Sequence, residues 1–301
     1  MESFQNKSYQ RHADHFCAYR QGGEKEEEAR LWLDRDSVDA WRHERMHQLV
    51  DPVLESYPDA SWLTVGDGRY GTEAQYIISK GGRALASDIS GHLLAEAKQF
   101  GLIPDFSVAN AEDLSFDDNA FDFVQCKDAY HHCPRPNLAL YEMLRVARTG
   151  VILIEPNDIF AAKGVLQSLL NRARLLARKL RGQSDSEHTF EESGNYAYRL
   201  SRRELEKIAI GLNLKRLAFN GINDAFIESA GTEKMSSNGR SLKTIRTLIG
   251  LQNILCKLGL ADYGYLSAIV FKSEMTREAE ERLGKLGWNL INLPQNPYIS
   301  S

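Results

Sequence analysis

The sequence predicts an α/β protein with a doubly wound, mostly parallel sheet and helices on both faces. Between residues 62 and 156, short apolar segments alternate with helical segments of about ten residues. Glycines cluster after the first apolar segment, and an aspartate ends the second. Parallel strands that are covered on both faces have this apolar character. A glycine-rich turn after the first strand is also where such folds bind nucleotide-like ligands.

Composition agrees with a packed globular domain. Of the 301 residues, 43% are hydrophobic and 26% are charged. The formal charge of -4 gives no general attraction to nucleic acid, so we expect no nucleic-acid partner. The chain opens without a basic and apolar leader, and no apolar run reaches the roughly 18 residues of a membrane span. We therefore expect a cytoplasmic protein without an integral membrane segment.

The first 35 or so residues are polar, and we expect a loose arm or the edge of a lid there. We expect the charged side chains of the run GEKEEEAR within them to be solvated. Asp36 or Ser37 is a candidate N-cap for a helix in which apolar residues recur from Val38 to Leu54. Pro58 breaks this pattern before the first strand.

The central segment alternates strands and helices. Expected strands cover residues 62–66, 83–88, 105–110, 121–126 and 150–156, and expected helices cover residues 72–81, 92–101 and 138–147. A long helical pattern follows at 160–181. Ser201 and Glu204 then form a capping box for a helix over 201–212. Two late strands, at 213–219 and 266–272, flank an amphipathic segment at 241–260.

The stretch WLTVGDGRYGTEA at residues 62–74 carries the strongest motif. Gly66, Gly68 and Gly71 form G-x-G-x-x-G between a strand and a helix, and Asp88 ends the next strand 22 residues after Gly66. Glycines let a ligand approach the backbone, and a carboxylate at the end of the second strand accepts hydrogen bonds from ribose hydroxyls. This order predicts an adenosine-bearing cofactor, which is either NAD or S-adenosylmethionine.

Residues 110–156 decide between these cofactors. They contain the phrase LSFDDNAFD, a strand that ends near YHH, and EMLRV before the fifth strand. With the upstream glycines and Asp88, this order resembles the class I S-adenosylmethionine-dependent methyltransferases over roughly residues 58–156. The resemblance implies a seven-stranded sheet with its last strand antiparallel, S-adenosyl-L-methionine as the cofactor, and methyl transfer as the reaction.

The resemblance also assigns the glycine loop and the strand-two acid. Gly66, Asp67 and Gly68 would pass along the methionine and ribose parts of the cofactor, and Gly71 completes the glycine pattern. Asp88 would bind the ribose hydroxyls.

The remaining cofactor contacts follow strands two, three and four. Ile89 would pack on one face of the adenine. Asn110 would accept a hydrogen bond from the adenine amino group, Ala111 would offer its backbone N–H, and Glu112 follows in the same loop. Lys127 would lie beside the methionine moiety.

Three positions depart from the family pattern. Many relatives have an acid in place of Thr64, a glycine in place of Tyr70 and an aspartate in place of Asn110. The amide of Asn110 still accepts a hydrogen bond, so that change costs little. Because of Thr64 and the displaced glycine, the sequence does not determine the path of the glycine loop. Tyr70 either covers the cofactor or faces the core.

Methyl transfer needs a desolvated nucleophile aimed at the methyl carbon, and positioning supplies much of the acceleration. His131 is the first candidate for a general base because histidine titrates in the useful range and the end of strand four faces the ligand. A structural role is its alternative. Glu155 and Asn157, after strand five, are further catalytic candidates on the rim.

Two histidine groups raise the question of a metal, and for both we expect none. HERMH, from His43 to His47, matches a helical zinc motif, but Arg45 adds a cation and no third-ligand motif follows. Its histidines are expected on the polar side of the helix. His131, His132 and Cys133 are adjacent at a strand end and should point in different directions.

The expected domain organisation is an N-terminal arm and helical cap (1–57), a methyltransferase domain (58–273) and a C-terminal extension (274–301). Lid insertions are expected at about 157–200 and 224–262. Helix 160–181 has basic flanks that either snorkel or contact an anionic substrate or membrane surface.

A roofed pocket favours a small-molecule acceptor such as a sugar or secondary metabolite, methylated on oxygen or nitrogen. The alternatives are a catalytically silent S-adenosylmethionine-binding partner protein and a NAD-type Rossmann enzyme. The sequence leaves a homo-oligomer as one alternative for the oligomeric state.

Overall fold

A mixed sheet lies at the centre of the computed structural model, which describes residues 3–158, 169, 173, 189–191 and 194–298. Its strands follow the order β3-β2-β1-β4-β5-β7-β6-β8. They are β1 (Ser61–Val65), β2 (Arg83–Asp88), β3 (Phe106–Val108), β4 (Phe121–Lys127), β5 (Ala147–Pro156), β6 (Arg216–Ile222), β7 (Tyr265–Phe271) and β8 (Asn289–Asn292). Strands β1 to β5 pair in parallel, and β7 runs antiparallel to both β5 and β6. The predicted α/β class and the antiparallel late strand are confirmed.

Helices cover both faces of the sheet. They are α1 (Phe4–Cys17), α2 (Glu26–Leu31), α3 (Val38–His47), α4 (Asp51–Ser56), α5 (Thr72–Ser79), α6 (His92–Gln99), α7 (Pro136–Val146), α9 (Arg202–Gly211), α10 (Arg240–Lys257) and α11 (Arg277–Lys285). The described 3-10 turns are η1 (Gln48–Val50), η2 (Tyr130–His132), η4 (Glu228–Gly231) and η5 (Met235–Ser237). Ser201 caps α9 by accepting the N–H of Glu204 at 3.2 Å, as predicted.

Alternation along the strands builds two cores. Leu63 and Val124 face a cluster that includes residues of α7 and α9. Their neighbours Trp62 and Phe123 stack with ring centroids 4.9 Å apart in a cluster with residues of α4, α5 and α11. Burial of these apolar side chains on both faces stabilises the sheet and fixes where its strands end.

The prediction of seven strands is wrong by one. Strand β8 pairs antiparallel with β6, in the segment expected to be a C-terminal extension. Trp288 and Leu293, which flank it, are buried in the two cores. The extra strand covers the edge that β6 would otherwise expose, and exposed edges invite pairing with other chains.

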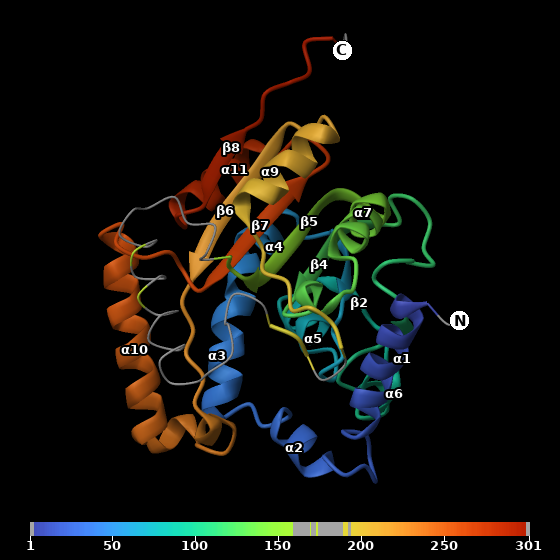
Figure 1. The fold of residues 1–301 in the computed structure, drawn as a ribbon, viewed down its shortest axis with the longest axis vertical. Coiled ribbons are helices and arrows are strands. Elements are labelled where there is room, and N and C mark those ends of the chain that lie inside the picture. The colour runs from blue at the N-terminus through green and yellow to red at the C-terminus, as the bar shows by residue number, and fades with distance from the viewer. Residues whose placement is uncertain (1–2, 159–168, 170–172, 174–188, 192–193, 299–301) are drawn as a thin grey trace.

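The N-terminal segment is helical where a loose arm was expected. Ser3 caps α1 by accepting the N–H of Asn6, and α2 follows. Figure 1 shows α1, α2, α3 and α10 on the lower side of the view, where the arrowhead of β6 points. Because parallel strands end at one edge of a sheet, these helices surround the edge that binds ligands in such folds. Apart from residues 169 and 173, the predicted lid helix at 160–181 lies outside the described residues.

Candidate functional site

The glycine loop forms where three strand ends approach one another. Gly66 has a φ of +75°, and a Cβ there would lie 2.1 Å from the Cβ of Ala129, which follows β4. A Cβ on Gly68 would lie 2.9 Å from a carboxylate oxygen of Asp88. Both positions therefore require glycine because of close approach. Gly71, with a φ of +69°, starts α5.

Thr64 and Tyr70 explain how the loop keeps its path without the family residues. The Thr64 hydroxyl, on β1, donates to the Asp67 carboxylate at 2.8 Å and so ties the glycine loop to the strand before it. Tyr70 has a φ of 57°, a left-handed conformation that glycine adopts more easily. Its side chain is 1% exposed and packs in a cluster with Tyr19 and Ala74. Of the two expected positions for Tyr70, it takes the one in the core.

Asp67 shapes the loop through its side chain. It is buried, and it accepts the backbone N–H groups of Glu73 at 3.1 Å and Ala74 at 2.9 Å. These are N–H groups of the first turn of α5, which have no partner within the helix. Asp67 therefore fixes the start of α5.

Asp88 ends β2 as a buried carboxyl group. One of its oxygens accepts the N–H of Ser90 at 2.7 Å. Burial raises the pKa of Asp88 to about 7, although backbone hydrogen bonds from Ser90 and Gly68 oppose this rise. Hydroxyl donors from a ligand would favour the ionised form.

A hollow lies against these strand ends. Its lining includes six of the predicted cofactor residues: Gly66, Asp88, Ile89, Asn110, Ala111 and Glu112. The other four, Asp67, Gly68, Gly71 and Lys127, are not among the lining residues in the described chain. Three side chains of α1 that sequence reasoning missed also line it: Ser8, Tyr9 and His12.

Helix α1 is tied to the hollow by a polar cluster. The Tyr9 hydroxyl donates to Glu112 at 2.7 Å, and Arg135 Nε donates to the same carboxylate oxygen at 2.6 Å. The backbone N–H of Arg135 donates to the other oxygen at 2.7 Å. Glu112 therefore joins α1 to the start of α7. Asn110 accepts the N–H of Glu112 at 3.0 Å and so keeps this loop in place.

Glu155 does not lie on the rim, where the sequence had suggested it. Its side chain is fully buried and accepts the backbone N–H groups of Ala129 at 3.0 Å and Tyr130 at 2.9 Å. Its second oxygen lies 2.5 Å from Nδ1 of His131. Burial lowers the pKa of His131, but the Glu155 carboxylate outweighs it and the net pKa is raised. Asn157 donates to the carbonyl of Tyr263 at 2.8 Å.

His131 and His132 point closer together than the sequence argument assumed. They lie in η2, which follows the strand, and their ring centroids are 3.9 Å apart. Adjacent residues diverge on a strand, but a 3-10 turn does not impose that alternation. His132 Nδ1 contacts Oε1 of Glu191. His12 of α1 lies beside His132 with ring centroids 5.3 Å apart, and burial lowers its pKa to about 4.

The HERMH histidines face a buried charge network, and the prediction that they lie on the polar side of the helix is wrong. Lys127 Nζ lies 3.0 Å from Glu73 and 3.2 Å from Nδ1 of His43. His47 Nε2 lies 3.3 Å from the same Glu73 oxygen. Arg69 also contacts His43 at 3.4 Å. Cations beside His43 oppose metal binding there.

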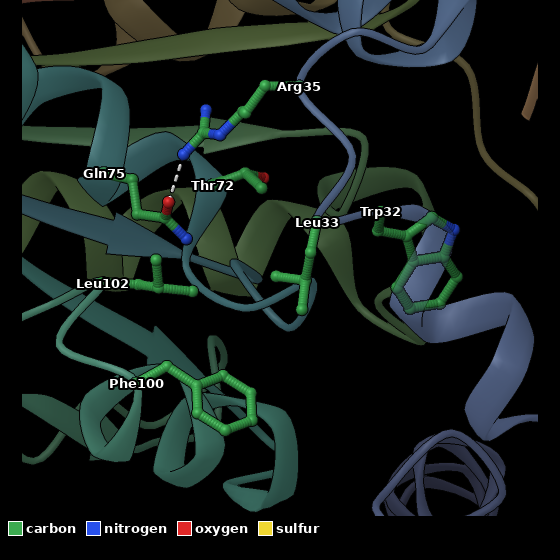
Figure 2. Close-up of a pocket in the computed structure, with 7 residues that line it drawn as sticks. All are labelled: Trp32, Leu33, Arg35, Thr72, Gln75, Phe100 and Leu102. Atoms are coloured by element: carbon green, nitrogen blue, oxygen red, sulfur yellow. Dashed lines mark hydrogen bonds between the residues drawn. The ribbon is translucent and has the colours of Figure 1, made fainter. Parts of the chain in front are cut away.

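Figure 2 shows a second hollow, between α5 and the segment after α2. Arg35 donates to Gln75 at its edge, and Trp32, Leu33, Phe100 and Leu102 supply apolar walls. None of the strand ends described above lines it, so the hollow at Asp88 is the candidate site. Within the described residues, no helix is both long enough and apolar enough to cross a membrane.

Known proteins match the chain over this region. A family model described as a methyltransferase domain matches residues 63–154. A sarcosine/dimethylglycine N-methyltransferase from Halorhodospira halochloris is 31% identical over 222 residues, which cover 65% of this chain and 77% of the relative.

Two solved structures are also similar to this chain. A S-adenosylmethionine-dependent methyltransferase from Methanosarcina mazei is 19% identical, with 74% of this chain and 98% of that chain covered and a TM-score of 0.47. The 1,6-didemethyltoxoflavin-N1-methyltransferase of Burkholderia thailandensis is 12% identical, with 91% and 92% covered and a TM-score of 0.49. From the family model and the N-methyltransferase relative, the chain belongs to the S-adenosylmethionine-dependent methyltransferases and is an enzyme of that family.

Proposed function

We propose that this enzyme methylates a small-molecule acceptor bound at the α1 end of the hollow beside Asp88. The observation that carries the proposal is that one hollow joins the predicted cofactor residues to side chains of α1 and η2. The hydrogen bond from Tyr9 to Glu112 holds α1 over this space. A roofed hollow of this kind suits a small acceptor better than a polymer.

The residues around the hollow fit S-adenosylmethionine. The Asp88 carboxylate is available to ribose hydroxyls, Gly66 and Gly68 permit close approach, and Ile89 offers an apolar face for the adenine. The backbone of Ala111 and the side chain of Asn110 lie at the same end. When bound, the cofactor supplies an electrophilic methyl group. The protein's part is to hold both ligands in line and to exclude water.

Lys127 has a different place in this proposal. Its ammonium group forms ion pairs with Glu73 and Asp128, and these two carboxylates already neutralise its charge. Asp67 is likewise engaged with α5. We propose that both residues position the glycine loop, and that direct contacts to the cofactor come from the residues that line the hollow.

The acceptor is proposed to be an amine. The H. halochloris relative is named for methylation of sarcosine and dimethylglycine nitrogen. Within the described residues, the lining of the hollow contains the carboxyl groups of Asp88 and Glu112 and no lysine or arginine. A negative surrounding favours a cationic amine over an anionic acceptor. His131 as a general base stays a prediction.

A two-part measurement tests the proposal. Calorimetry with S-adenosylhomocysteine tests the cofactor residues, and transfer of labelled methyl to sarcosine, dimethylglycine, glycine and a panel of neutral sugars tests the acceptor. We expect micromolar cofactor binding and transfer to at least one amine. His15→Ala, an exposed change on α1, is the control for general damage. Binding without transfer to any amine, together with turnover on a sugar, would contradict the amine assignment.

A further inference from the structure

We propose that His131, His132 and Glu191 form a binding site for a divalent transition-metal ion such as Zn²⁺. One ligand atom from each residue lies within 4.8 Å of the other two. In a tetrahedral zinc site with bonds of about 2.0–2.2 Å, ligand atoms lie about 3.4 Å apart, so modest side-chain shifts suffice. Two imidazoles and a carboxylate are a common zinc ligand set.

A buried carboxylate holds the ring of His131 on the side of Nδ1. Its Nδ1 lies 2.5 Å from the buried Glu155 carboxylate, which directs the lone pair of Nε2 away from Glu155 when Nδ1 carries the proton. A carboxylate behind a histidine is the usual partner of metal-bound imidazole and raises its basicity. Glu155 cannot move easily, because it also accepts two backbone N–H groups of the same turn.

The segment that carries Glu191 is held against the histidine turn by hydrogen bonds. Asn195 Nδ2 donates to the carbonyl of His132 at 2.8 Å, and the N–H of Tyr198 donates to the carbonyl of His131 at 3.1 Å. The N–H of Glu191 donates to the carbonyl of Asn195 at 2.8 Å. Ligands from distant parts of the sequence are therefore kept together by contacts that do not involve the ligand atoms.

The local charge favours a cation. Glu155, Glu191 and Asp128 all act on His131 as negative charges. The charge around the HERMH histidines is positive instead, since Lys127 and Arg69 contact His43. Of these two histidine groups, only the one at η2 has a field that attracts a divalent ion.

The site lies at the proposed acceptor end, because His132 lines the hollow. A bound ion would occupy Nε2 of His131, so the metal and the general-base prediction exclude each other. Metal binding itself does not depend on the proposed function, and it can be measured without any acceptor.

The test uses the untagged full-length protein, freed of metal by a chelator and titrated with Co²⁺ and then Zn²⁺. We expect one ion per chain by calorimetry and visible Co²⁺ absorption bands of the tetrahedral type. His132→Ala and Glu191→Gln should each weaken binding at least tenfold. Glu155→Gln should weaken it about 10–100-fold, since a glutamine amide favours the His131 tautomer with its proton on Nε2.

His15→Ala is the matched control, and S-adenosylhomocysteine binding confirms that each variant is folded. The inference is overturned if the wild type binds no ion above the level of His132→Ala. It is also overturned if binding survives in His132→Ala and Glu191→Gln but is lost in His43→Ala.

Discussion

Replacing Asp88 with asparagine should make the cofactor-free protein more stable at pH 8 and weaken its binding of S-adenosylhomocysteine. The pKa of Asp88 is raised from 3.8 to about 7 by burial. The folded state therefore holds a proton that the unfolded state has released between these values. Stability is lost as pH rises from about 4 to 7, because ionisation of the buried carboxyl group opposes folding.

The magnitude follows from this shift. About three pKa units correspond to about 4 kcal/mol at pH 8. Asparagine keeps the acceptor for the N–H of Ser90 but places an amide donor toward Gly68, at a cost of about 1–1.5 kcal/mol. The net gain in unfolding free energy is about 2–3 kcal/mol, or roughly 5 °C in melting temperature. At pH 4 the gain should turn into a loss of about 1 kcal/mol, since Asp88 is then protonated in the folded state and only the cost of the amide donor remains.

Cofactor binding should move in the opposite direction. Charge-assisted hydrogen bonds from ribose hydroxyls are worth about 1.5–3 kcal/mol, so Asp88→Asn should weaken binding about 10–150-fold, and Asp88→Ala should do the same. Wild-type affinity should fall as pH drops below about 7 because the carboxyl group must then lose a proton to accept both hydroxyls.

Thermal melts at pH 4 to 8 and calorimetry over the same range measure both effects. Asp105→Asn is the control, because Asp105 is exposed and Lys98 lowers its pKa. That variant should show no gain at pH 8. The reasoning fails if Asp88→Asn is less stable than wild type at pH 8, or if wild-type affinity is flat between pH 5.5 and 8.

Three further changes test single contacts. Gly68→Ala places a Cβ 2.9 Å from an Asp88 oxygen, so calorimetry should show at least tenfold weaker S-adenosylhomocysteine binding. Tyr9→Phe removes the donor to Glu112, so amides of α1 should exchange about tenfold faster with solvent while the sheet stays protected. Ser201→Ala removes the α9 cap and should lower the unfolding free energy by about 1 kcal/mol in denaturant; an unchanged midpoint would show that the cap contributes nothing.

The sequence predicted the part of the fold that local patterns encode. Strand β2 begins and ends at the predicted residues, Arg83 and Asp88, because its apolar run stops at a charged residue. Gly66 and Asp88 could be found because strand ends and loop glycines leave a signal within a few residues. Strand β8 was missed because its four residues carry little periodicity, and its pairing with β6 depends on the finished sheet.

The rest of the site depends on contacts between distant residues. Tyr9 and Glu112 are 103 residues apart, so nothing near Tyr9 in the sequence shows that α1 lines the hollow. Its local signal was the cap at Ser3, followed by Ser8 and His12 one turn apart on one face. The approach of His131 and His132 depends on the 3-10 turn, and an apolar strand pattern does not predict such a turn.

The anchoring of α1 has a consequence for how this enzyme can change its substrate. The proposed cofactor side of the hollow is encoded by residues 66–112, whereas Ser8, Tyr9 and His12 are encoded in the first dozen residues. Glu112 joins the two parts through side chains alone. Mutations in the first helix can therefore reshape one end of the hollow without altering a strand of the sheet. A library confined to that helix would vary the proposed acceptor end while the proposed cofactor end stays unchanged.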